Sequence, residues 1–184
     1  MEPEYRVQNV VVTGKLADKL NLLEIYDKVP GSVYEPGKFP ALRIKKFGVG
    51  FLLYSSGNFV CSGARSTELA KEKVDELVKL LNDGGVKVKC GSIEIRNIVV
   101  SVDLNKNLRL HELAYAIPDS EYDPEAFPGM KLRKGSTRIL IFRTGKAIIP
   151  GLRTIEEIKN TISWLQETID SAEEEIKTFK KPGY

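Results

Sequence analysis

The chain has 184 residues, of which 42% are hydrophobic and 29% charged, and its formal net charge is +3. This length and hydrophobicity suit one or two domains with a proper core. The sequence has no run of ~18 apolar residues, which is the length needed to span a membrane. The small basic surplus permits an anionic partner without demanding one. The acidic N-terminus shows no signal peptide. The two cysteines lack metal-ligand spacing and indicate thiols in a reducing cytosol.

The first half of the chain predicts four strands, two helices and a loop. In chain order they are a strand at 7–13, a helix at 20–29, a loop at 33–40, strands at 41–46, 50–55 and 59–64, and a helix at 66–82. The segment at 7–13 alternates as a strand does, hairpin turns join the next three strands, and apolar residues recur at helical spacing in the helices. Asn21 and Ser66 are the expected N-caps, and Gly84 and Gly85 are expected to stop the second helix.

The second half repeats this order without a gap. Tyr122 lies 88 residues after Tyr34, and Gly151 lies 88 residues after Gly63 (122−34 and 151−63). The repeated elements are a strand at 95–101, a helix at about 109–117, a loop at 121–128, strands at 129–134, 138–143 and 146–152, and a helix at 155–170. Such a period indicates a tandem duplication. We expect two pseudosymmetric half-domains, residues 1–91 and 92–184.

Each half therefore predicts an antiparallel sheet of the α+β class with helices on one face. Both faces of the predicted sheet are apolar, although the helices can cover only one of them. A large uncovered apolar face on a protein marks a binding site. Its strand positions are predicted to be Asn9, Val11, Leu52, Tyr54, Val60 and Ser62, and then Asn97, Val99, Leu140, Phe142, Ile148 and Pro150, with Phe39 and Phe127 at the loops.

Basic side chains flank this face, and four are expected to contact phosphates: Lys45, Arg65, Arg133 and Arg153. An apolar surface rimmed by cations suits the minor groove of DNA, where an aromatic wedge can enter a base step. Because guanine alone places an exocyclic amine in that groove, an aliphatic floor should favour A·T pairs. The prediction is a protein that binds A/T-rich double-stranded DNA.

Four segments carry a resemblance to a known family: Val7–Val11, Arg96–Val99, Tyr122–Gly129 and Tyr54–Ser66. Through these segments the sequence resembles the TATA-box-binding protein family, in the two-repeat form that archaea carry. The resemblance implies a ten-stranded saddle with four helices on its convex face and a concave face on the minor groove. It also implies a general transcription initiation factor that recruits transcription factor B and RNA polymerase in a prokaryotic cytoplasm, associated with the nucleoid and needing no cofactor.

The resemblance also implies residue roles. Phe39 with Tyr54, and Phe127 with Phe142, would be the intercalating aromatics, and Asn9 and Asn97 would donate to adenine N3 or thymine O2. The other residues of the face would form the groove floor. The contact with transcription factor B would be made by Asp123, Glu125 and Ala126. Tyr54 stands where a phenylalanine is usual in the family, and Pro150 stands where a threonine is usual.

Other interpretations stay open on the sequence alone. An isolated Phe is more often a core residue, and the two asparagines could instead satisfy backbone groups. A divergent regulator that works mainly through protein contacts fits the same pattern, and so does pairing of two copies through their apolar faces. A single histidine without a nucleophile or a metal-ligand cluster gives catalysis no basis.

Overall fold

The computed structural model describes residues 3–179. Its contacts divide into two compact units, which we call the first unit (Gln8–Ile98) and the second unit (Met1–Val7 with Val99–Tyr184). This division does not follow the predicted repeat boundary at residue 91. The reason is that two long strands, β1 (Tyr5–Lys15) and β5 (Ile93–Asp103), each supply residues to both units.

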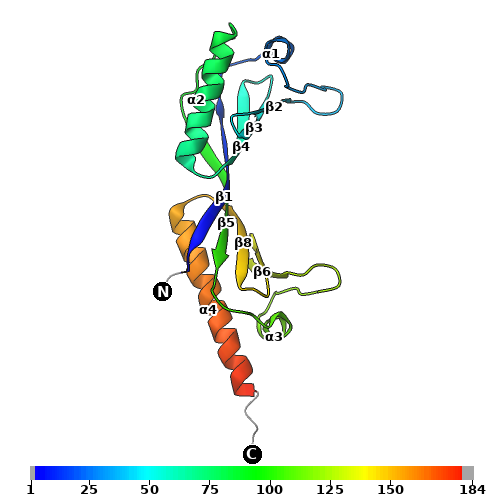
Figure 1. Cartoon of the computed structure of the whole chain (residues 1–184), viewed down its shortest axis with the longest axis vertical. Helices are drawn as coiled ribbons and strands as arrows, with labels where there is room; N and C mark the ends of the chain where they lie inside the picture. Colours follow the sequence, from blue (N-terminus) through cyan, green and yellow to red (C-terminus); the bar gives the residue numbers. More distant parts are fainter. Residues whose placement is uncertain (1–2, 180–184) are drawn as a thin grey trace, which may run out of the picture. The chain divides into compact units, whose positions relative to one another are not determined.

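The first unit contains two helices, three complete strands and parts of β1 and β5 (Figure 1). Its remaining elements are α1 (Leu22–Lys28), β2 (Leu42–Lys46), β3 (Val49–Leu53), β4 (Asn58–Ala64) and α2 (Thr67–Asp83). The strand order is β2-β3-β4-β1, followed by residues 93–98 of β5. The β2–β3, β3–β4 and β1–β4 pairs are antiparallel, as predicted.

The second unit repeats this arrangement. Its elements are α3 (Leu110–Ala116), β6 (Met130–Lys134), β7 (Thr137–Ile141), β8 (Lys146–Leu152) and α4 (Ile155–Phe179). Residues 99–103 of β5 are followed by β8, β7 and β6, and residues 5–7 of β1 lie on the other side of β5. The predicted α+β class and the repeated order of elements are therefore confirmed.

The expected number of strands was wrong. The described residues form eight strands, not ten, and in each unit the missing strand is reduced to a single bridge. Val33 and Arg43 exchange two backbone hydrogen bonds of 2.9 Å, and Glu121 pairs with Lys131 in the same way. Pairing goes no further in the first unit because the chain turns at once, with the Lys38 and Phe39 N–H groups both donating to the Glu35 carbonyl.

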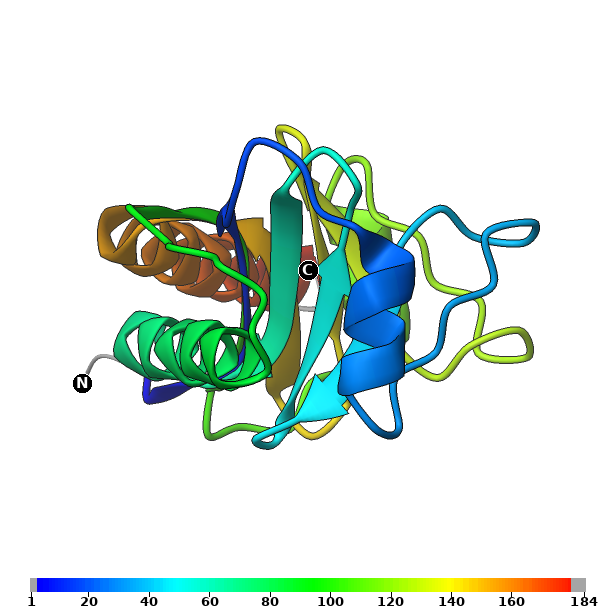
Figure 2. The ribbon, with the colours of Figure 1, turned by 90° about the horizontal axis from the view of Figure 1, so that it is seen from above.

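The core of each unit lies between the sheet and its long helix. In the first unit the buried strand positions alternate along each strand, as at Val10 and Val12, and they face the apolar stripe of α2. Figures 1 and 2 show α2 on one side of these strands and the loop at residues 34–40 projecting from the other. Cys61 belongs to this core, and burial raises the pKa of its thiol to about 11. One sheet face is thus filled by side chains and the other is left for solvent.

The helix ends follow local hydrogen-bonding signals. Ser66 Oγ accepts from Leu69 N at 3.0 Å, and Asn21 Oδ1 accepts from Glu24 N at 3.2 Å, which confirms both predicted caps. The prediction for the last helix was too short, because α4 continues to Phe179. Its apolar spacing continues through the buried Ala172, so the helix keeps a face to pack beyond residue 170.

Within residues 3–179, no helix has the length and apolarity needed to cross a membrane.

Candidate nucleic-acid interface

In each unit the sheet face opposite the long helix remains apolar and partly open. All twelve predicted strand positions are half-buried or exposed, while at least one neighbour of each along the chain is buried. Cross-strand pairing places Leu52 beside Val60 in the first unit and Leu140 beside Ile148 in the second. Paired residues share a face, so each unit presents an aliphatic floor.

Asn9 is held in place by a bulge in the first unit. The register between β1 and β4 shifts between Val10 and Val11, and this leaves Gly63 as the extra residue, with a φ of +104°. The Gly63 N–H donates to Asn9 Oδ1 at 2.7 Å. Since the amide oxygen is engaged, the group that Asn9 offers to a ligand is its NH₂, a hydrogen-bond donor. Asn97 is half-buried on β5.

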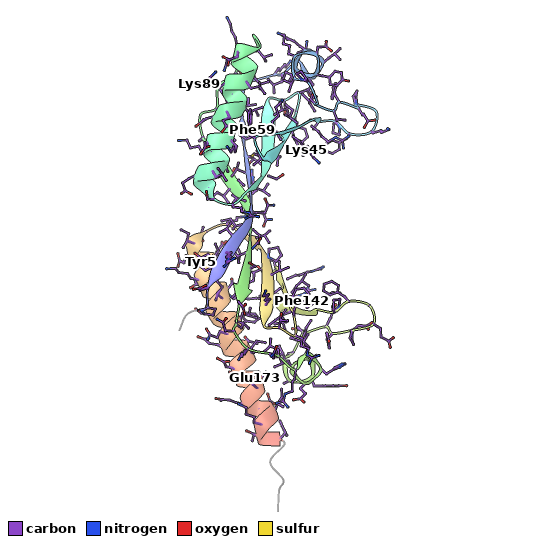
Figure 3. All side chains as sticks on the ribbon, in the orientation of Figure 1. Tyr5, Lys45, Phe59, Lys89, Phe142 and Glu173 are labelled. Carbon is purple, nitrogen blue, oxygen red and sulfur yellow. The ribbon has the colours of Figure 1, made fainter. Side chains whose placement is uncertain are left out.

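The two aromatic pairs differ. Phe127 is 37% exposed, and its ring lies 6.0 Å from the Phe142 ring at an interplanar angle of 59°. Phe39 is 36% exposed, but the described residues contain no such pair between it and Tyr54, and the Arg43 guanidinium lies 5.9 Å from the Phe39 ring instead. Figure 3 shows Phe142 on the side of its unit that faces away from α4.

Ion pairs separate the basic residues of the rim into two groups. Lys38 and Arg43 both bind Glu35, at 2.7 and 3.1 Å, and Lys131 lies 3.5 Å from Glu121. By contrast, the residues predicted to contact phosphates are exposed and form no ion pair within the described part of the chain; they are Lys45, Arg65, Arg133 and Arg153. Their charges are available to an anionic ligand.

The loop at residues 121–128, the second loop, is held in a turn by hydrogen bonds to Asp123. Asp123 Oδ1 accepts from the Glu125 N–H at 3.1 Å, and the Asp123 carbonyl accepts from the Phe127 N–H at 2.9 Å. This local turn presents Glu125 and Ala126 to solvent. It also fixes the backbone next to Phe127.

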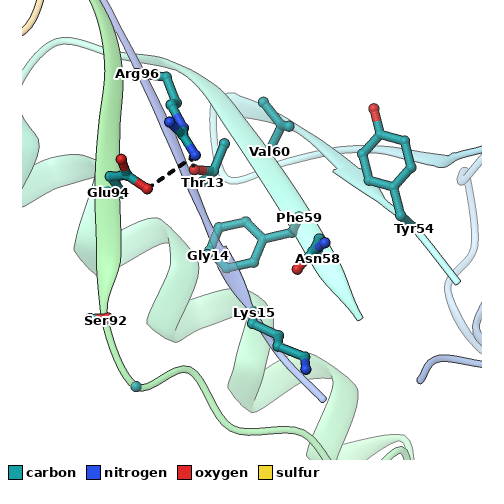
Figure 4. A pocket seen from close by; sticks show the side chains of 11 residues that line it. Thr13, Gly14, Lys15, Tyr54, Asn58, Phe59, Val60, Ser92, Glu94 and Arg96 are labelled. Atoms are coloured by element: carbon teal, nitrogen blue, oxygen red, sulfur yellow. Dashed lines mark hydrogen bonds and ion pairs between the residues drawn. The ribbon is translucent and has the colours of Figure 1, made fainter. Parts of the chain in front are cut away.

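A cavity of about 550 Å³ lies beside Tyr54 and was not expected from the sequence (Figure 4). Arg96 forms one wall, where its Nε donates to Thr13 Oγ1 at 3.1 Å and its guanidinium lies 3.1 Å from Glu94. The alternating pattern of β1 had placed Thr13 in a strand, but no local signal joins residue 13 to residue 96. The contact depends on the pairing of distant strands.

The described residues contain no cluster of three or more His, Cys, Asp or Glu side chains that could hold a metal ion.

The fold and this face define a duplicated α+β protein whose two units each leave an apolar, cation-flanked sheet surface open. The family model of "Transcription factor TFIID (or TATA-binding protein, TBP)" matches residues 4–83 and 92–172, one match for each repeat. The TATA-box-binding protein of Methanocaldococcus jannaschii is 35% identical over 95% of this chain and 98% of its own length. That of Pyrobaculum calidifontis is 35% identical over 89% of this chain and 84% of its own.

The comparison of structures agrees. The solved structure of Methanococcus jannaschii TBP superimposes with a TM-score of 0.86 at 33% identity, over 92% of this chain and 99% of that one. The chain belongs to the TATA-box-binding protein family, and the resemblance read from its sequence is confirmed.

Proposed function

We propose that this protein is a general transcription initiation factor that binds A/T-rich promoter DNA in the minor groove and bends it. In each unit the aliphatic floor would lie on sugars and base edges. Phe39 with Tyr54, and Phe127 with Phe142, would enter base steps at the two ends of the site, since minor-groove proteins kink DNA with such wedges. The name shared by its relatives supports this role.

One observation carries the proposal: each unit keeps a half-exposed aliphatic floor with an exposed phenylalanine at its edge. A protein gains nothing for folding by leaving such a surface in water, so its retention is best explained by a ligand. Asn9 supplies a hydrogen-bond donor within this floor, which suits the adenine N3 and thymine O2 acceptors. Under this proposal, the floors of both units would bind the same duplex.

Base composition provides the first test. Gel-shift titrations should show tighter binding to an A/T-rich duplex than to a G/C-rich duplex of equal length. Inosine–cytosine pairs should be accepted nearly as well as A·T pairs, because inosine lacks the minor-groove amine. Equal affinity for all three duplexes would exclude minor-groove readout.

The phosphate contacts can be tested by salt. Replacing Arg65 with Ala should lower the slope of log affinity against log salt by about one unit, because one phosphate contact is lost. Lys38→Ala is the matched control, since Lys38 is already paired with Glu35. A slope that changes equally in both variants would contradict the assigned phosphate contacts.

Recruitment of transcription factor B and RNA polymerase is proposed to use the second loop. Glu125 and Ala126 are exposed on a turn that Asp123 stabilises. Glu125→Arg should therefore reduce the supershift by transcription factor B while binary DNA affinity stays the same. Loss of both activities together would place the loop in DNA binding instead.

The same assays distinguish a regulator that works through protein contacts. Such a protein would show weak, sequence-indifferent DNA binding yet would still bind transcription factor B. Sedimentation without DNA would then show whether two copies pair through their open faces, and competition by A/T-rich duplex would dissociate them if DNA uses the same face.

A further inference from the structure

The hairpin between β2 and β3 contains an unusual residue. Lys46 pairs with Val49, so the connection has only two residues, Phe47 and Gly48. Both have positive φ, +58° and +79°. A two-residue turn of this kind favours Asn-Gly or Gly-Gly, because a bulky L-residue is strained at positive φ. Phe47 therefore occupies a position that glycine would fill more easily.

The duplication supplies the comparison. The residue 88 positions after Phe47 is Gly135, which has the same φ of +58° in the hairpin between β6 and β7. The Phe47 side chain is 38% exposed, so the ring is not a core residue that would offset the strain. Backbone strain retained for a ring that is only partly buried points to function.

An open hollow of about 670 Å³ lies next to Phe47. Its floor lies in a row of cross-strand partners that runs from Val11 through Ser62 and Gly50 to Lys45. Gly50 contributes no side chain, which leaves the space between Ser62 and Lys45 open. The hollow is thus continuous with the proposed groove floor, at the edge of the first unit.

The charges beside the hollow suit DNA backbone. Lys45 and Lys46 both line it, and neither forms an ion pair within residues 3–179. An aromatic face flanked by two cations matches a deoxyribose flanked by two phosphates. Figure 3 shows Lys45 on the side of its unit that faces away from α2, as this docking requires.

We propose that Phe47 packs on a deoxyribose of the bound duplex while Lys45 holds an adjacent phosphate, so that the hollow seats one backbone strand where it leaves the groove floor. The inference rests on the proposed function and deepens it. The second unit cannot make this contact, because Gly135 carries no ring and Arg138 lies at the position of Gly50 (50+88). The aromatic seat is therefore specific to the first unit.

The central test replaces Phe47 with Gly, the residue of the second unit. Affinity for the A/T-rich duplex should fall about tenfold, the effect of losing one partly buried aromatic contact. The salt slope should not change, because the ring carries no charge. The melting temperature should stay the same or rise by about 2–4 °C, because strain is relieved. Loss of binding without loss of stability is the expected signature.

Hydroxyl-radical footprinting reads the contact directly, because the radical cleaves at exposed deoxyribose. The unaltered chain should protect a sugar at the edge of its site, and Phe47→Gly should lose that protection while the rest of the footprint stays. Phe179→Ala is the control, since that ring is 81% exposed at the end of α4. A double-mutant cycle with Lys45→Ala should show coupling if both residues hold one nucleotide.

The outcomes are separable. If the unaltered chain does not bind the A/T-rich duplex, the proposed function fails and this inference fails with it. If it binds and Phe47→Gly keeps the complete footprint, the inference alone is overturned, whatever the affinity. Phe47→Asn, which tolerates positive φ, serves as a second variant. A fall in melting temperature in both variants would assign the ring to folding and would also overturn the inference.

Discussion

In the first unit the Leu16 N–H donates to the Gly57 carbonyl at 2.8 Å, and in the second the Leu104 N–H donates to the Gly145 carbonyl at 3.0 Å. The bond from Leu20 N to Ser55 O is repeated from Leu108 N to Arg143 O, 88 residues later at both ends. These backbone hydrogen bonds therefore recur in both units, although most side chains differ.

Their open faces diverge, and one methyl group explains part of the difference. A Cβ on Gly129 would lie 2.7 Å from the Phe127 ring and 3.1 Å from the Phe142 ring, so glycine makes room for the ring pair. The corresponding residue of the first unit is Ala41 (129−88), and there Phe39 contacts Arg43 instead. Packing constrains the shared core, whereas the open faces were free to become different.

Breaking the shared backbone should have the largest effect. Gly57→Ala and Gly145→Ala should each lower the free energy of unfolding by roughly 3 kcal/mol or more, because a steric clash of the added Cβ adds to the strain of positive φ. An added Cβ would lie 1.7 Å from Ala17 O or 2.2 Å from Lys106 O. Denaturant unfolding measures the loss.

Gly31→Ala is the matched control for these glycines. Gly31 also has positive φ, +82°, but a Cβ there would meet nothing within 4 Å. Gly31→Ala should lower the free energy of unfolding by only about 1 kcal/mol, because backbone strain is its only cost. Equal losses at all three glycines would show that the close approach is unimportant.

The ring pair should couple in one unit only. In DNA-binding assays, Phe127→Ala and Phe142→Ala should be non-additive by about 1 kcal/mol, the range for an aromatic pair, whereas changes at Phe39 and Tyr54 should add. In a Gly129→Ala background the coupling should disappear, making the second unit like the first. Coupling that survives Gly129→Ala would contradict the role assigned to that glycine.

A smaller effect concerns the long helix of the second unit. Lys106 binds Asp170 and Glu173, the latter at 2.8 Å. Lys106→Ala should lower stability by about 0.5–1 kcal/mol, the range for partly exposed pairs. Lys79→Ala, which removes an exposed pair with Asp83 on α2, is the control and should cost less.

The pH dependence of this cluster has a definite sign. Burial by itself lowers the pKa of Lys106, but the hydrogen bonds that its ammonium donates to Asp170 and Glu173, together with the charges of these carboxylates, outweigh burial and the net pKa is raised. The stabilisation is therefore complete below the unfolded pKa of about 10.4 and is lost as pH rises through the folded pKa. In thermal melts, the difference between the unaltered chain and Lys106→Ala should persist up to about pH 10.4 and shrink only as the pH is raised further.

The smallest effect concerns the short helices. Asn21 caps α1, but its counterpart Arg109 (21+88) makes no side-chain cap on α3. Arg109→Asn should stabilise the second unit by about 0.5 kcal/mol through the new cap. The loss of the exposed ion pair between Arg109 and Glu112 should reduce this gain. Hydrogen exchange at the first turn of α3 should slow, and unchanged exchange would show that the cap is not limiting.

Most of the fold could be predicted because its signals are local and occur twice. The caps at Asn21 and Ser66, the hairpin turns and the apolar stripes of the long helices follow from nearby residues. The candidate face followed from apolar residues on both faces of the predicted sheet, of which the helices could cover only one, and its residues are half-buried or exposed. Phe47 was not among the candidate site residues predicted from the sequence. Aligning the two repeats would have shown it, because the aligned residue of the second repeat is Gly135.

The sequence by itself determined the duplication, the order of elements and the family, because a period of 88 residues and local hydrogen-bonding signals need no coordinates. Only the tertiary structure decided that Gly63 engages the oxygen of Asn9, that Arg96 reaches Thr13, and that eight strands form instead of ten. Those outcomes depend on distances between residues that are far apart in the chain. Such distances are set when strands pair and side chains pack, which is information that no local pattern contains.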